Sequence, residues 1–144
     1  MKTLYETDFS AWIESQVQAL KKKDFAHLDI EHLLEEMETL GDSLKEAIES
    51  HLIILLMHKL KQLVQPERDG KSWNDSIINA RFQIEHKRER QPSLRNYSQK
   101  VFIECFHDAR RHASKQTGID LRKFPQVCPW TFEEVMGDNH EHHS

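Results

Sequence analysis

The sequence predicts an all-α fold, an up-and-down helical bundle of about five helices with an extended C-terminal segment and a short final helix. Three observations lead to this prediction. Apolar residues recur every three or four positions over long stretches, which is the period of a helix with one buried face. The chain has only four glycines and four prolines, too few for a loop-rich or all-β fold. All eight stand where a predicted helix begins or ends.

The first predicted helix begins after Thr7 or Asp8, because either side chain can cap a helix N-terminus. Its apolar residues form one stripe that is expected to face the core, and they are Phe9, Trp12, Ile13, Val17 and Leu20. Three lysines follow at 21–23, where positive charge suits the C-terminal end of the helix dipole. These lysines are interpreted as a solvated helix end.

The next helix has Asp29 as its expected N-cap. Its expected inward face consists of Ile30, Leu33, Leu34, Met37 and Leu40. Gly41 permits a stop, and Ser43 with Glu46 forms a capping box for a new helix. Two structures remain open here. Either two helices are joined by a tight turn at Gly41, which the restart signals favour, or one long helix is kinked there.

The helix over about 43–64 is the expected centre of the bundle. Its stretch 52–57 is apolar all round, so we expect neighbouring elements to enclose it on several sides. The face expected to lie inward consists of Leu44, Ile48, Leu52, Leu55 and Leu63. Pro66 then ends the helix.

A fourth helix is predicted to start with Ser72 as its cap and to end in the basic run 86–90. Its expected inward residues are Trp73, Ile77, Ile78 and Phe82. Pro92 suits the first position of a fifth helix, and Gly118 ends that helix. Residues 119–130 are expected to be extended and to wrap the bundle. Thr131 and Glu134 form a capping box for a last helix over 132–136.

The length of 144 residues fits one helical domain over 1–137, followed by a flexible polar tail at 138–144. The net charge of −4 is uneven. Residues 1–66 hold 7 Lys/Arg and 12 Asp/Glu, residues 67–111 hold 10 and 7, and residues 112–144 hold 3 and 5. The middle of the chain is therefore mildly basic and the two ends are acidic, a pattern too weak to predict nucleic-acid binding by itself.

The chain is expected to be cytoplasmic. Its start lacks the apolar stretch of a signal peptide, and the six-residue run 52–57 is far shorter than the about 20 residues that span a bilayer. Cys105 and Cys128 belong to no C-x-x-C motif, which indicates two reduced thiols. No membrane association is predicted.

Several short motifs occur in one order along almost the whole chain. They are Tyr5-Glu-Thr-Asp-Phe9 with Trp12, the stretch Leu33 to Gly41, Leu55-Leu-Met-His58, Gln65-Pro-Glu-Arg68 with Ser72-Trp73, Pro92-Ser-Leu94, Ala109-Arg110, Thr117-Gly118, and Phe124-Pro with Cys128-Pro-Trp-Thr131. In this order they resemble the domain of unknown function 29 family, which is common in cyanobacteria and other bacteria. The resemblance implies a small all-α bundle and no established activity. Two positions depart from it, since similar sequences carry an acidic residue at His107 and a glutamate at Gln116.

One set of side chains could hold a metal ion inside the bundle. Di-metal bundle sites use a Glu from each of two helices and a Glu-x-x-His motif from each of two others. The candidate ligands are Glu35, Glu38, His58, Glu104 and His107. Only Glu104-x-x-His107 supplies such a motif on a helix interior, so the set is incomplete and no cofactor is predicted. An acidic solvated face explains the same glutamates. If the helices over 29–40 and 43–64 pack antiparallel, Glu35 or Glu38 could instead accept a hydrogen bond from His58.

A second set of side chains could bind phosphate groups. Its members are Arg68, Lys71, Arg81, Lys87, Arg88 and Arg110. Acidic residues interrupt the set, and Arg110 is also suited to a structural ion pair. Nucleic-acid binding is therefore the alternative function and not the leading one.

No G-x-S-x-G, H-E-x-x-H, P-loop or dinucleotide-binding fingerprint occurs in the chain. The leading prediction is a non-enzymatic protein-interaction or regulatory module, with an unknown protein partner or a homodimer formed through a helix face. A nucleic-acid-associated protein that uses the basic 67–111 region ranks second, and a metal-dependent enzyme ranks third. The histidine-rich end at 140–143 is interpreted as an adventitious tail.

Overall fold

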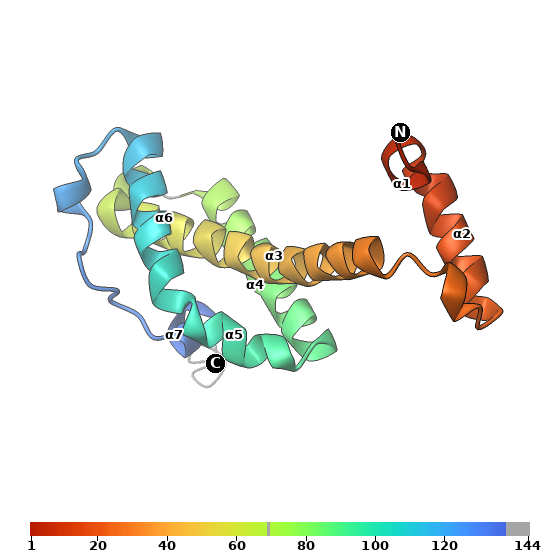
Figure 1. The fold of residues 1–144 in the computed structure, drawn as a ribbon. Coiled ribbons are helices and arrows are strands. Elements are labelled where there is room, and N and C mark those ends of the chain that lie inside the picture. The colour runs from red at the N-terminus through yellow and green to blue at the C-terminus, as the bar shows by residue number, and fades with distance from the viewer. Residues whose placement is uncertain (69, 138–144) are drawn as a thin grey trace. The chain divides into compact units, whose positions relative to one another are not determined.

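A computed structural model describes residues 1–68 and 70–137. Within these ranges the chain is helical and has no strand, as the sequence predicts (Figure 1). The helices are α1 (Leu4–Thr7), α2 (Phe9–Lys21), α3 (Ile30–Val64), α4 (Lys71–Arg90), α5 (Ser93–Lys100), α6 (Phe102–Thr117) and α7 (Phe132–Val135), with short 3-10 helices η1 (Phe25–His27), η2 (Pro66–Arg68) and η3 (Leu121–Lys123). None of the helices in these ranges is long and apolar enough to cross a membrane.

The chain divides into two compact units, Met1–Ser43 and Leu44–Ser144, and the boundary falls within α3. Each unit is described by itself below. The single domain expected over 1–137 stays a prediction, and the tail expected at 138–144 lies outside the described residues.

The first unit contains α1, α2, η1 and the beginning of α3. Asp8 caps α2 as predicted, because its carboxylate accepts a hydrogen bond from the Ala11 amide at 3.1 Å. Helix α1, where Thr3 and Glu6 form a capping box, was not predicted from the sequence. A helix of only four residues is too short to show a periodic pattern of apolar residues.

Helix α3 continues through Gly41, so the break that the restart signals favoured is wrong. A glycine inside a helix costs about 1 kcal/mol relative to alanine. The neighbouring turns are rich in leucine, methionine, glutamate and lysine, which are good helix formers and tolerate that cost. The antiparallel packing needed for a hydrogen bond between His58 and Glu35 or Glu38 depended on a turn that does not form.

The second unit holds a continuous hydrophobic core. Its largest fully buried apolar side chains come from α3, α4, α6, the segment after η3, and α7, and they are Ile48, Leu52, Leu55, Leu56, Leu60, Ile84, Phe106, Phe124 and Val135. The predicted burial of the run 52–57 is largely confirmed, although Ile54 is exposed. The centre of the core therefore lies on the stretch of α3 that the sequence indicates.

Helices after α3 differ from the prediction mainly at their ends. The expected fifth helix is two helices, α5 and α6, which meet at Val101. Val101 is buried and β-branched, so the break falls at a residue with a weak helix preference. Helix α4 begins at Lys71 with Gly70 as its N-cap, which lies two residues before the expected cap Ser72. Pro92 precedes α5 as its N-cap.

The C-terminal segment runs from Gly118, which has the left-handed φ of 75° that favours glycine, to α7. Figure 1 shows this blue segment leaving the end of α6 and returning the chain to the neighbourhood of α5. Helix α7 packs against the start of α6, since the rings of Phe132 and Phe102 lie 5.7 Å apart. Phe124 is buried as expected for a wrapping segment, whereas Val127 is exposed.

Several residues expected to face inward are exposed. In the second unit these are Leu44, Leu63, Ile78 and Phe82. In the first unit they are Phe9, Ile13, Val17 and Leu20 on α2, and Ile30, Leu34, Met37 and Leu40 on α3. At these positions the helices form as predicted, but the apolar side chains are exposed instead of buried.

Candidate functional site

The start of α3 is fastened to α2 by the side chain of Asp29. Its carboxylate accepts hydrogen bonds from the indole Nε1 of Trp12 at 3.0 Å and from the His32 amide at 3.3 Å. The amide of Asp29 in turn donates to the side-chain oxygen of Gln16 at 2.7 Å. Asp29 is therefore the N-cap that the sequence predicted, and it also holds the first unit together.

His32 extends this network toward α1. Its Nδ1 donates to Asp29 at 2.6 Å, and its ring stacks on Tyr5 with centroids 3.8 Å apart. The Tyr5 hydroxyl donates to Glu36. The hydrogen bond with Asp29 raises the pKa of His32, and the same bond lowers the pKa of Asp29. The hydrogen bond to Glu36 raises the pKa of Tyr5 to about 12.

The hydrogen-bonded pair of Asp29 and His32 makes the stability of the first unit depend on pH. The contribution of Asp29 is present above its ordinary pKa of about 4 and is lost as pH falls through its lowered pKa. The contribution of His32 is complete below about 6.5 and is lost as pH rises through its raised pKa. The contact is therefore strongest between about pH 4 and about pH 6.5.

An Asp29→Asn change should lower the pKa of His32, because the neutral amide no longer stabilises the imidazolium. An NMR titration of the histidine rings measures this shift. The matched control is Asp24→Asn, which removes the partner of His27 at the same spacing and should lower only the pKa of His27. An unchanged His32 titration in the Asp29→Asn chain would contradict the expected result.

The first unit presents a large uncovered apolar surface, which we call the open face. Its members come from α2 and the start of α3 and are Phe9, Ile13, Val17, Leu20, Ile30, Leu34, Met37 and Leu40, with exposed fractions of 37–70%. A groove of about 320 Å³ runs between the two helices and is lined by several of these side chains together with Leu33 and Glu36. Exposed apolar patches of this extent mark interaction sites on soluble proteins.

The open face has an acidic edge. Glu31, Glu35, Glu38 and Asp42 follow Ile30, Leu34 and Met37 around the helix at helical spacing, and all four are exposed. The first 43 residues hold four Lys/Arg and ten Asp/Glu, a net charge of −6. Glu35 and Glu38, two of the candidate metal ligands, therefore belong to the solvated acidic edge of the first unit.

The candidate metal ligands are divided between the two units. Glu35 and Glu38 belong to the first unit, whereas His58, Glu104 and His107 belong to the second. Glu104 and His107 are exposed on α6. Within residues 1–68 and 70–137, no group of three or more His, Cys, Asp or Glu side chains could hold a metal ion.

Three of the candidate phosphate-binding arginines make internal contacts in the second unit. Arg81 donates to the carbonyl of Val135 at 2.8 Å. Arg88 pairs with Glu85 at 3.2 Å, and its guanidinium lies 4.7 Å from the centre of the Phe132 ring. Of the remaining candidates, Lys71 pairs with Asp75 at 2.7 Å, Lys87 donates to Gln83 at 3.4 Å, and Arg68 is exposed.

Arg110, the third of these arginines, fastens the C-terminal segment. Its Nη2 donates to the carbonyls of Leu121 at 2.8 Å and Phe124 at 3.2 Å. Replacing Arg110 by alanine should speed hydrogen exchange and proteolysis over 119–130, because two backbone carbonyls lose their hydrogen bond to the guanidinium. The control is Arg111→Ala, which removes an exposed arginine that pairs with Asp108. Equal protection of 119–130 in both variants would contradict this role.

The second unit also contains two thiols, Cys105 and Cys128, and the half-buried His58. Burial raises the pKa of Cys105 to about 12, so its thiol is neutral at pH 7, and burial raises the pKa of Cys128 as well. Burial, with the nearby Lys61, lowers the pKa of His58, whose Nδ1 has no hydrogen-bond partner among the described residues. Neither thiol is therefore activated as a nucleophile.

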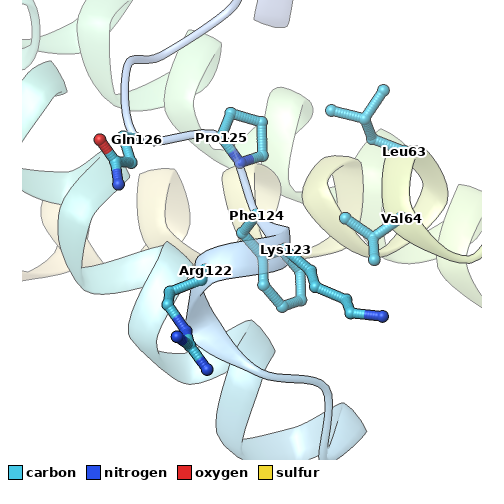
Figure 2. Close-up of a pocket in the computed structure, with 7 residues that line it drawn as sticks. All are labelled: Leu63, Val64, Arg122, Lys123, Phe124, Pro125 and Gln126. Atoms are coloured by element: carbon cyan, nitrogen blue, oxygen red, sulfur yellow. The ribbon is translucent and has the colours of Figure 1, made fainter.

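A surface pocket of the second unit lies where α3 ends. Figure 2 shows Leu63 and Val64 on one side and Phe124 and Pro125 on the other. Arg122 also lines the pocket. Its guanidinium donates to the carboxylate of Asp120 through Nη2 at 2.9 Å and through Nε at 3.1 Å. The pocket therefore does not offer a free guanidinium to an anion.

A family model described as "Domain of unknown function DUF29" matches residues 4–140. No curated protein matches the chain, and no solved structure matches it. The open face and the Asp29 network both lie within the matched residues.

Proposed function

The chain belongs to the DUF29 family, and from its structure we propose that it is a non-enzymatic protein-interaction module that forms a homodimer through the open face of the first unit. The observation that carries this proposal is the exposure of eight large apolar side chains on two neighbouring helices. The family description names no activity, so the function is argued from this surface alone.

The size of the open face suits a second copy of the chain. At about 200 Å² for each fully exposed large side chain, the exposed fractions amount to roughly 800 Å². One partner contributes about 800 Å² to a standard protein interface. Two copies joined through this face would complete a four-helix arrangement of α2 and α3 with a shared apolar core.

The first unit also has too small a buried core to be stable unless its open face is buried against a partner. Among residues 1–43 only Trp12 and Ala19 are buried apolar residues. Units of about 40 residues commonly need a disulfide, a metal or oligomerisation to be stable. The described part of the chain has no disulfide and no group of side chains that could hold a metal ion. Association with a second copy through the open face would stabilise the first unit instead.

Sedimentation equilibrium of the full chain over a range of concentrations tests the proposal. A mass that rises from that of the 17.1 kDa chain to twice that value is the expected result. A monomer at every concentration would contradict it, and so would a larger open-ended series, because an isologous interface closes at two copies.

Self-association should strengthen with salt. Each first unit carries a net charge of −6, so two such units repel each other at low ionic strength. Raising the salt from about 0.05 M to about 0.5 M shortens the Debye length and screens this repulsion. The dissociation constant should therefore fall, and a rise would indicate that ion pairs between unlike charges hold the dimer.

Nucleic-acid binding and metal-dependent catalysis, the two lower-ranked functions, gain no comparable support from the described residues. Arg81, Arg88 and Arg110 are engaged within the second unit, which weakens a basic surface for nucleic acid. The proposed module uses no cofactor. Stoichiometric iron, manganese or zinc after mild purification, lost on Glu35→Ala, would overturn this ranking.

We place the module in the bacterial cytoplasm. The support is its pair of free thiols, which suits a reducing compartment. Recovery of the tagged chain from the membrane or secreted fraction would contradict this location.

A further inference from the structure

Among the described residues, no contact or backbone conformation requires glycine at position 41. Gly41 lies inside α3, and its φ is not positive, so the backbone there suits any L-residue. Apart from its two chain neighbours and the backbone of its own helical turns, no atom of the described residues lies within 4 Å of a Cβ built at this position. Glycine therefore lowers the stability of the helix relative to alanine, and no contact within the described chain offsets that loss.

Gly41 stands in line with the apolar ridge of the open face. Ile30, Leu34, Met37 and Gly41 follow one another at spacings of four, three and four residues, which places them on one side of α3. Leu34 and Met37 are 58% and 70% exposed. The ridge thus ends at a residue with no side chain, next to the large exposed side chains of Leu34 and Met37.

We infer that Gly41 is the point where α3 of one copy crosses α3 of the second copy. This inference rests on the proposed homodimer and adds where the two helices meet. A residue without a side chain lets two helix backbones approach closely, while the large residues beside it pack around the crossing. In a symmetric dimer the residue at the two-fold axis faces its own copy, and glycine facing glycine allows the closest approach.

The decisive experiment compares helix stability with association in the Gly41→Ala chain. Alanine should raise the helix content and the thermal midpoint at low protein concentration, because it is the better helix former. The same substitution should weaken the dimer about tenfold, because a methyl group separates the crossing helices. A Gly41→Leu chain should be monomeric over the same concentrations while remaining helical by circular dichroism.

Thr39→Ala is the matched control. Thr39 is exposed and lies on the opposite side of the same turn, so alanine there also favours the helix. It should leave the dissociation constant unchanged. This control separates an effect at the crossing from a general effect of a stiffer helix.

A cross-linking arm tests the geometry directly. Gly41→Cys should form a disulfide between two copies under mild oxidation, since a disulfide requires Cα atoms closer than about 7 Å. Thr39→Cys, with the native cysteines equally present, should not. A wild-type dimer whose dissociation constant is the same in the Gly41→Ala and Gly41→Leu chains would overturn the crossing point alone. A monomeric wild-type chain would overturn the homodimer as well.

Discussion

A chain in which Leu34 and Met37 are both replaced by glutamate is expected to be monomeric at concentrations where the wild-type chain is a dimer. Both residues lie at the middle of the open face and are mostly exposed, so the substitutions leave the fold of one copy almost unchanged. Dimerisation would bury two carboxylates from each copy among apolar side chains, next to an edge that is already acidic. We expect the dissociation constant to rise more than about a thousandfold.

The matched control for this experiment is Thr39→Glu with Ser43→Glu. It adds the same charge to the same helix, but on the side away from the ridge, where both native residues are exposed. Sedimentation of the two variants should give a monomer for the first and a dimer for the second. If both variants dissociate alike, net charge rather than the open face controls the association.

Replacing Phe106 by alanine is expected to destabilise the second unit by about 3–5 kcal/mol. Phe106 is fully buried in α6 and belongs to the main core, so its removal leaves a cavity that the neighbouring side chains cannot fill completely. Chemical denaturation followed by circular dichroism measures the change. For a protein of this size the thermal midpoint should fall by about 10–20 °C.

Ile103→Ala is the control for Phe106→Ala. Ile103 is in the same helix one turn earlier, but it is 52% exposed. Its truncation should cost less than about 1 kcal/mol. Similar losses for both variants would mean that α6 contributes to stability through its helix propensity and not through the core.

The sequence predicted the helices well where the relevant signals are local. Asp8 and Asp29 cap α2 and α3, Thr131 and Glu134 form the capping box of α7, and Gly118 ends α6 with a positive φ. The caps depend on a side chain meeting the backbone within three or four residues, and the end of α6 depends on the backbone freedom of one glycine. Such contacts form in any tertiary environment, and a single sequence can therefore reveal them.

The candidate site was predicted only in part. The sequence identified Asp29 as a cap, but it did not bring Tyr5 to His32 or Glu36, which lie far along the chain. It allowed a hydrogen bond between His58 and Glu35 or Glu38 through an antiparallel pair that the continuous α3 does not form. Contacts between distant segments depend on how the helices pack, and periodicity alone does not determine that packing.

What the sequence by itself determined is the all-α class, the helical stripes and most helix ends, because hydrogen bonding and side-chain spacing along a helix are local. Only the tertiary structure decided which stripes are covered. The stripe of Ile48, Leu52 and Leu55 is buried, while the equally apolar stripe of Ile30, Leu34 and Met37 on the same helix is open. Burial depends on the neighbours that a face meets, and a sequence shows that a face is apolar without showing what covers it.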